Sequence, residues 1–234
     1  MKNKNLLILS AILLCVGILL VVLGSGGEKG YSYEVQEETL ENRRDGNNIL
    51  IRYPLLSSEN QDLSAANDQI SKLLAQCLYD SYGAGITNLS LELNYEVGRQ
   101  DKKWFSVMWE GSGSVSGTAH PNDHFFAVNL RVSDGARLKL IDIIRPEEGF
   151  IKILKERFVS QNERVAAIFE SYTDEELLRM IAEVDQGGLG GFSYLTEKSI
   201  VISLPVAHAA GDHAETEIPL QSLKAYMRME LNES

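Results

Sequence analysis

The sequence is poor in cysteine, and this excludes a fold held together by disulfides. Only two of its 234 residues are cysteines, Cys15 and Cys77. Cys15 falls within an apolar run near the N-terminus, and the one remaining thiol cannot form an intramolecular disulfide. The hydrophobic core must therefore stabilise the fold. Cys77 lies on the apolar face of a predicted helix, so we expect it to be buried and unreactive.

Positive charge is also scarce. The chain has 22 Lys and Arg against 33 Asp and Glu, which gives a formal net charge of -11. Such a chain is poorly suited to neutralise phosphates, so we expect no nucleic-acid binding. Its field attracts basic proteins instead. Surplus carboxylates also keep a domain soluble, and this second reading of the charge needs no partner.

Sequence motifs for cofactors are missing as well. The glycines at 187, 188, 190 and 191 lack the Lys-Ser/Thr ending of a phosphate-binding loop. A Gly-x-Ser-x-Gly nucleophile lies at a turn from a strand into a helix, and the serines of 111–117 do not lie at a plausible helix start. No internal repeat is visible. We therefore expect no cofactor.

The most informative feature that is present is an apolar run over Leu6–Leu23. As a helix it would span about 27 Å, close to the thickness of a bilayer hydrocarbon core. Lys2 and Lys4 precede it, and the positive-inside rule keeps them in the cytoplasm. We expect a single-pass cell-membrane protein whose N-terminus is inside and whose remaining mass is outside.

A cleaved signal peptide is the alternative for this segment, because it too begins with a basic stretch and an apolar core. The protein would then be secreted. The residues that follow, Val22–Gly27, lack a clear small-x-small cleavage pattern, and the apolar run is longer than the usual signal core. Retention as an anchor is therefore the favoured reading. The expected organisation is a cytoplasmic cap (1–5), a transmembrane anchor or signal segment (6–23), a linker (24–30), and an ectodomain with an N-terminal half (31–116) and a C-terminal half (117–234).

The pattern of the ectodomain predicts an α+β fold. Polar and apolar residues alternate over Leu89–Glu96, as in a strand with one buried face. Apolar residues at helical spacing predict a helix over 64–82 with Ser64 as its N-cap. Helices and strands are grouped rather than alternated, which predicts an antiparallel sheet with helices packed on one face. Further strands are expected over 31–41, 48–56, 104–110, 125–132, 136–143, 192–196 and 199–204, and further helices from Pro146 to Phe158 and from Thr173 to Val184.

All four histidines fall in two clusters that also contain carboxylates. His120 and His124 accompany Asp123 in the first cluster, and the second contains His208 and His213. Imidazoles and carboxylates together suit Zn²⁺, so these four histidines are the candidate metal ligands. The alternatives are polar loop histidines, one hydrogen-bonded structural histidine, or a pH switch.

Aromatic residues in the predicted strands are candidate binding residues. Adjacent strand residues point to opposite faces of a sheet, so one aromatic of each neighbouring pair would be exposed if only one face were covered. An exposed aromatic can anchor a protein partner or a sugar ring. A sheet covered on both faces is the competing explanation. The candidates are Trp104, Trp109, Phe125 and Phe126, with His120 beside them.

Several short motifs between Gly117 and Lys224 carry a resemblance to a known family. Gly117-Thr-Ala-His120 follows a predicted strand, and Asp134-Gly135 forms a turn before Leu138-Lys-Leu-Ile-Asp-Ile143. Residues 33–80 add a strand ending in Tyr53-Pro54 and a helix. The other motifs are Phe192–Ile202, Ala209-Ala-Gly211 and Ile218-Pro219-Leu220. Together they resemble a bacterial extracytoplasmic domain that forms the outer part of lysozyme-sensing anti-sigma factors and accompanies the catalytic domain of certain peptidoglycan deacetylases.

The resemblance implies an antiparallel sheet with flanking helices and a role in binding near the cell wall rather than in catalysis. Thr118 replaces the second glycine of the family's Gly-Gly-Ala-His motif, so that turn is expected to differ. The five residues before the apolar run are too few to bind a sigma factor, so we do not expect anti-sigma signalling. We also expect no deacetylase domain after Ser234.

These observations lead to one main hypothesis and two alternatives. The main hypothesis is a membrane-anchored extracellular binding domain of the bacterial envelope, not an enzyme, whose ligand is a cationic wall-active protein such as a lysozyme-like hydrolase or a peptidoglycan glycan. The first alternative is a metal-dependent extracellular hydrolase that uses the histidines. The second is a structural accessory subunit of an envelope complex.

Overall fold

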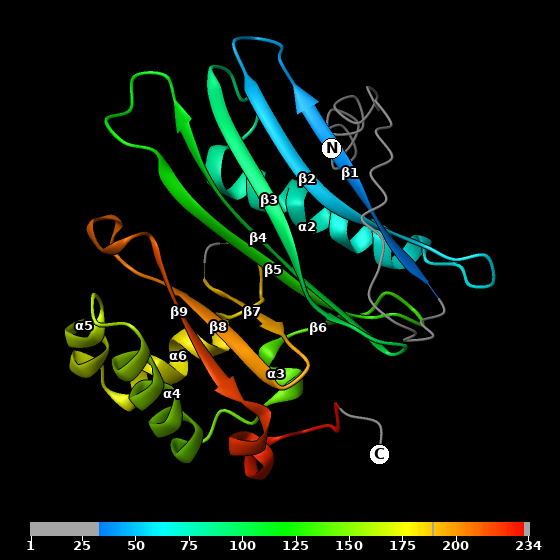
Figure 1. The fold of residues 1–234 in the computed structure, drawn as a ribbon. Helices are drawn as coiled ribbons and strands as arrows, with labels where there is room; N and C mark the ends of the chain where they lie inside the picture. Colours follow the sequence, from blue (N-terminus) through cyan, green and yellow to red (C-terminus); the bar gives the residue numbers. More distant parts are fainter. Residues whose placement is uncertain (1–32, 189, 232–234) are drawn as a thin grey trace, which may run out of the picture.

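The structure is a computed structural model that describes residues 33–188 and 190–231, and it contains two β-sheets (Figure 1). The large sheet has six strands in the order β1-β2-β3-β4-β5-β6, and the small sheet has three in the order β7-β8-β9. Figure 1 shows the small sheet and most of the helices below the large sheet, with α2 behind the large sheet.

All but one of the strand pairs in the large sheet are antiparallel. The exception is the parallel pair of β2 and β3, which α2 connects (Ser64–Tyr82). A parallel pair requires such a crossover, because the chain must return to the starting edge of the sheet. The strands are β1 (Glu34–Asn42), β2 (Asn48–Ser57), β3 (Leu89–Gln100), β4 (Trp104–Val115), β5 (Asn122–Arg131) and β6 (Arg137–Leu138).

The small sheet is a meander covered by the later helices. Its strands are β7 (Phe192–Leu195), β8 (Ser199–Pro205) and β9 (His213–Pro219), all antiparallel. The helices are α3 (Leu140–Ile143), α4 (Glu148–Gln161), α5 (Ala166–Ser171) and α6 (Asp174–Glu183), with 3₁₀ turns η1 (His208–Ala210) and η2 (Leu220–Tyr226).

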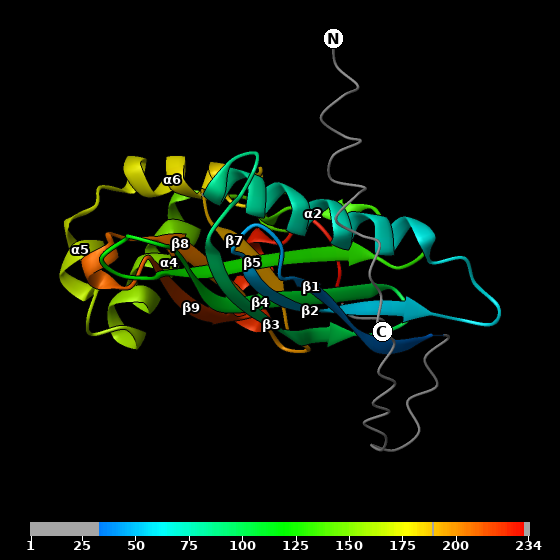
Figure 2. The same ribbon diagram turned by 90° about the horizontal axis from the view of Figure 1, so that it is seen from above.

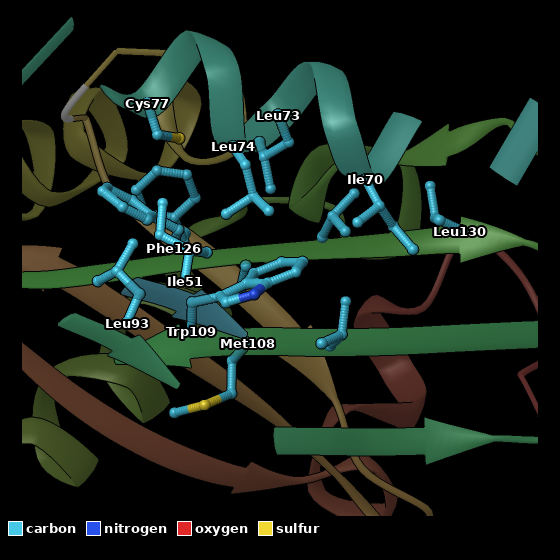
Figure 3. Packing of buried hydrophobic residues seen from close by; sticks show 14 of the residues in the cluster. Ile51, Ile70, Leu73, Leu74, Cys77, Leu93, Met108, Trp109, Phe126 and Leu130 are labelled. Atoms are coloured by element: carbon cyan, nitrogen blue, oxygen red, sulfur yellow. The ribbon is translucent and has the colours of Figure 1, made fainter. Parts of the chain in front are cut away.

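The first core lies between α2 and one face of the large sheet (Figures 2 and 3). Trp109 and Phe126 are at most 1% exposed beneath the helix, and Trp109 Nε1 donates to Arg52 O at 3.1 Å. The apolar face of α2 that the sequence predicts covers them, because its residues are buried at helical spacing. That face consists of Ala66, Ile70, Leu73, Leu74 and Cys77.

The second core lies between the small sheet and helices α3 to α6. Phe158 of α4 and Phe169 of α5 stack with ring centroids 3.9 Å apart. Helix α6 begins at the predicted capping box, because Glu176 N donates to Thr173 Oγ1 and Thr173 N donates to Glu176 Oε2. Both cores are built from residues that the sequence marks as apolar and periodic.

A buried polar contact joins the small sheet to the large one. Val107 and Trp109 of β4 belong to the α2 core, so Ser106 points to the opposite face. There Leu195 N of β7 donates to Ser106 Oγ at 2.8 Å and to Asn129 Oδ1 at 2.9 Å. Strand β7 therefore lies on the face of the large sheet that α2 does not cover. The large sheet is covered on both faces at β4 and β5.

Asp185 extends this network into the loops that follow α6. Its carboxylate accepts hydrogen bonds from Ser193 N, Ser193 Oγ and Leu140 N at 2.6–2.9 Å. The side chain is buried, and burial raises the pKa of Asp185 to about 6 despite these three donors. Asp185 has a φ of 63°, a left-handed conformation that Asp tolerates better than most residues. It thus fixes the starts of both α3 and β7.

The expected α+β class is confirmed, with a largely antiparallel sheet and helices packed on it. The strand expected over 136–143 is wrong beyond Leu138, because 140–143 is helical and Lys139 N donates to Asp142 Oδ2. Ser64 does not cap α2, since Asp62 Oδ1 accepts its backbone N–H instead. The Gly- and Ser-rich stretch belongs to β4 as far as Val115, in regular register with β3.

The apolar run Leu6–Leu23 lies outside the described residues. Over 33–188 and 190–231, none of the helices is both apolar and long enough for a membrane crossing. The division of the ectodomain between residues 116 and 117 stays a prediction. The large sheet continues past this point through β5 and β6.

Candidate functional site

The two histidine clusters meet in space although about 90 residues separate them in the sequence. The loop before β5 and the loop between β8 and β9 lie together, and the rings of His120 and His208 are 6.3 Å apart. Asp212 joins the loops, because one carboxylate oxygen accepts from Asp123 N at 2.8 Å and the other lies 2.8 Å from His208 Nδ1. One carboxylate thus connects the two loops.

His124 is a buried structural histidine. Its Nε2 lies 2.5 Å from the hydroxyl of Tyr82 at the end of α2, and its ring stacks on Phe126. Burial lowers the pKa of His124, although the nearby aspartates oppose this shift, so the neutral ring is favoured. The sequence analysis left open that one histidine is hydrogen-bonded and structural, and His124 fits that alternative.

His213 lies nearer to the junction of the two sheets. Its ring is 5.3 Å from that of Phe125 on β5, and its Nδ1 is 3.6 Å from Glu215 Oε1. Burial lowers the pKa of His213, against the pull of Glu110, Asp123 and Asp212. The side chain is 22% exposed, so one edge of the ring reaches solvent.

The structure brings the candidate metal ligands His120 and His208 together and keeps His124 and His213 in separate contacts. In the part of the chain that the structure describes, no three His, Cys, Asp or Glu side chains are arranged to hold a metal ion. The arrangement instead places the carboxylates of Asp123 and Asp212 near the partly buried imidazoles of His124 and His213.

Two glutamates meet across the junction. Glu110 lies on β4 and Glu215 on β9, and the two carboxyl groups influence each other electrostatically. Burial is the larger cause and the neighbouring Glu110 the smaller cause that together raise the pKa of Glu215 to about 7. Glu110 itself is exposed to solvent. A carboxyl group with such a pKa changes charge near neutral pH.

Tyr194 marks the centre of a wider acidic surface. Burial is the largest cause, and the charges of Glu215, Glu110, Glu96 and Glu217 are the smaller causes, that together raise the pKa of Tyr194 to about 12. Each charged group acting on this phenol is thus a glutamate, contributed by β3, β4 or β9. We call these four glutamates and Tyr194 the acidic junction. It lies on the side of the large sheet away from α2.

A glycine on β3 lets the strands of the junction approach closely. A side chain at Gly98 would overlap Leu195 O and the ring of Tyr194 on β7. The register of β3 against β4 shifts between Val97 and Arg99, so Gly98 lies in a bulge. The bulge and the missing side chain together bring β7 onto the large sheet.

The aromatic binding candidates are corrected by the structure. Trp104, Trp109, Phe125 and Phe126 are each at most 5% exposed, so none of them can anchor a partner on the surface. The expectation that one of each pair is exposed fails because α2 covers one face and the small sheet covers the other. His120 alone among these candidates is exposed.

Sequence reasoning did not find Glu110, Tyr194 or Tyr82. Glu110 is the first exposed residue after the buried segment Trp104–Trp109, a change in polarity that the sequence shows. Its partner Glu215 lies more than 100 residues later, so only the packing of β9 onto the large sheet reveals the pair. Tyr194 is one of nine tyrosines, and nothing in its sequence neighbourhood distinguishes it.

Comparison with one solved structure supports the fold. A member of the DUF3298 family from Bacteroides fragilis superposes with a TM-score of 0.55 at 15% identity, covering 86% of this chain and 96% of that one. A DUF3298 family protein from Pseudomonas aeruginosa gives 0.47 at 13% identity, covering 84% and 93%. No family model matches the sequence, and no curated protein matches it either.

Proposed function

We propose that the protein is a membrane-anchored extracellular binding domain of the bacterial envelope. Its ligand is a cationic wall-active protein of the lysozyme type, and a wall glycan is the second choice. Residues 6–23 serve as the anchor, with the N-terminus in the cytoplasm and the two-sheet domain outside. The resemblance to the outer domain of lysozyme-sensing anti-sigma factors, and to the region beside certain peptidoglycan deacetylases, supports this assignment.

The acidic junction is the observation that carries the proposal. Its glutamates come from three strands and two sheets, so the fold itself concentrates them. Glu96, Glu110 and Glu217 are exposed, and Glu215 remains 28% exposed. A surface of one charge accelerates association with an oppositely charged protein and suppresses wrong partners. A basic protein is therefore the partner that this surface fits best.

The full chain, purified in detergent, should bind hen lysozyme as a basic probe, with an affinity that falls as salt increases. Replacing Glu96→Lys and Glu217→Lys together should weaken binding roughly tenfold or more, because repulsion replaces attraction at the surface. The matched control is Glu148→Lys with Glu156→Lys on α4, which changes the net charge equally. It should change the affinity by no more than about twofold. Titration calorimetry measures both.

If both double variants lose affinity equally, only the net charge matters, and the acidic junction is not the binding surface. Absence of any complex at moderate salt would remove the basic protein as the ligand. Soluble peptidoglycan fragments are then the probe for the second choice, and failure of both probes would overturn the proposed binding function.

A further inference from the structure

His120 and His208 are two imidazoles that the fold brings together at the surface. Their ring centroids are 6.3 Å apart, and the ring planes are inclined by 36°. His120 is exposed, and the side chain of His208 is 51% exposed. A dissolved ion can therefore reach both rings.

Asp212 holds the ring of His208 and leaves one ring nitrogen available. Asp212 Oδ1 lies 2.8 Å from His208 Nδ1, and an ionised carboxylate can only accept, so Nδ1 of the neutral ring carries the hydrogen. The lone pair of the imidazole is then on Nε2. Asp212 Oδ2 accepts from Asp123 N at 2.8 Å, so the carboxylate is itself held in place. A carboxylate bound in this way is the usual outer partner of a metal-binding histidine.

The backbone of the loop between β8 and β9 places this carboxylate. Gly211 has a φ of 110° and Asp212 a φ of 65°, so two consecutive residues are left-handed. Gly211 N donates to His208 O at 3.0 Å, and Val206 N donates to Asp212 O at 2.9 Å. This turn brings the carboxylate back to the ring four residues earlier. The contact between Asp212 and His208 is therefore formed before any ligand binds.

The distance between the two rings distinguishes between coordination geometries. A metal ion lies about 2.0 Å from an imidazole nitrogen and hence about 3.2 Å from the ring centroid. Two rings on opposite sides of one ion are then about 6.4 Å apart, whereas two rings at the tetrahedral angle are about 5.2 Å apart. The observed 6.3 Å matches the first arrangement. Opposite positions exist in the tetragonal geometry of Cu²⁺ and Ni²⁺ but not in the tetrahedral geometry of Zn²⁺.

We propose that His120 and His208 bind one divalent transition-metal ion of tetragonal geometry, Cu²⁺ most tightly, and that Asp212 is the positioning residue. Among the residues that the structure describes, no third His, Cys, Asp or Glu is arranged with the pair to hold an ion, so water fills the remaining positions. Asp123 and Asp212 add negative charge beside the two rings, which favours a cation. Imidazole ligands bind Cu²⁺ more tightly than the other divalent ions of its row. The site shares no residue with the acidic junction and does not depend on the proposed function.

Cu²⁺ alone is the probe. Titration calorimetry of the untagged full chain in detergent should give one bound ion per chain. His120→Ala and His208→Ala should each weaken binding by at least about tenfold, the loss that even an outer partner of a ligand causes. The matched control His213→Gln removes a neighbouring imidazole outside the pair and should change the affinity by no more than about twofold. Electron paramagnetic resonance should show an axial Cu²⁺ signal coupled to two nitrogens, and to one nitrogen in either alanine variant.

Asp212→Asn tests the positioning role. The amide oxygen can still accept from Asp123 N, but the amide NH₂ donates to His208 Nδ1 and so moves the ring hydrogen to Nε2. Affinity for Cu²⁺ should then fall by about tenfold. The urea midpoint of the metal-free variant should stay close to that of the wild type, which separates this effect from a loss of the loop structure. An unchanged affinity in Asp212→Asn would overturn the positioning role.

Three results would overturn the metal site itself. The first is the absence of binding at micromolar Cu²⁺. The second is a Cu²⁺ signal with fewer than two coupled nitrogens, or several equivalent ions per chain, because other donors would then hold the metal. The third is an equal loss of affinity in His213→Gln and in the two alanine variants.

Discussion

The hydroxyl of Tyr82 occupies the space where a side chain at position 113 would lie. A β-carbon on Gly113 would overlap this hydroxyl, which is bound to His124. Gly113 lies on β4 and is buried. The glycine is therefore required by a close approach of α2 to the sheet, not by a turn.

Gly113→Ala should destabilise the protein by about 1–3 kcal/mol, because the methyl group displaces Tyr82 and breaks its hydrogen bond to His124. Urea unfolding measures the change. Combining it with Tyr82→Phe, which removes the hydroxyl, should cost less than the sum of the two single changes. Strict additivity in this double-mutant cycle would show that the hydroxyl is not the obstacle.

Strand β9 lies at the edge of the small sheet, and a side chain of α4 occupies part of that edge. Gln161 Nε2 donates to Glu217 O at 3.0 Å, and its Oε1 accepts from Glu217 N at 2.9 Å. The amide thus binds the strand as a neighbouring backbone would. An edge strand with free N–H and C=O groups is prone to pair with other chains. This side chain protects the element that carries Glu215.

Gln161→Ala should lower the free energy of unfolding by about 1–2 kcal/mol, since two backbone groups and the hydroxyl of Thr216 lose their partner. It should also increase self-association, because the edge of β9 becomes available. Urea unfolding and light scattering at several protein concentrations measure the two effects. Ser160→Ala, at the neighbouring position on α4, is the control. Equal behaviour of both variants would contradict a protective role for Gln161.

Most elements followed from sequence patterns, and the exceptions have identifiable causes. Period-two alternation predicted β3, and the Thr173 capping box predicted the start of α6. The error at 140–143 arose because Leu140 N is bound by the distant Asp185, which a local pattern cannot show. Similarly, β2 and β3 pair in parallel because α2 returns the chain, a matter of topology rather than of strand composition.

At the scale of the whole molecule, buried polar groups connect two hydrophobic cores. Asp185 holds Ser193 of β7, and Ser193 O accepts a hydrogen bond from Asn129 of the large sheet at 2.9 Å. The chain of bonds crosses from the loops after α6 to β5. Each of these groups would be costly to leave unpaired, so the network favours one relative placement of the sheets.

Asp185 should make stability depend on pH. Its folded pKa of about 6 exceeds the ordinary 3.8, so its stabilising contribution is complete below pH 3.8 and is lost as pH rises through 6. Asp185→Asn has no such titration and also loses a hydrogen-bond acceptor. The advantage of the wild type over this variant should therefore shrink by roughly 2 kcal/mol between pH 4 and pH 8.

Urea unfolding at pH 4, 6 and 8 measures this advantage. Asp68→Asn, on the exposed face of α2, removes a carboxylate from the surface and serves as the matched control. The prediction fails if the difference in free energy of unfolding between the wild type and Asp185→Asn does not change with pH. It also fails if the difference between the wild type and Asp68→Asn changes with pH to the same extent.

The sequence by itself determined the α+β class, the apolar face of α2 and the cap of α6, because each depends on residues close together in the chain. It left open whether the strand aromatics face solvent. Only the tertiary structure decided that both faces of β4 and β5 are covered and that Asp212 joins the histidine loops. Asp123 and Asp212 are 89 positions apart in the sequence, and so are Ser106 and Leu195. Local periodicity carries no information about which distant partner a strand will face.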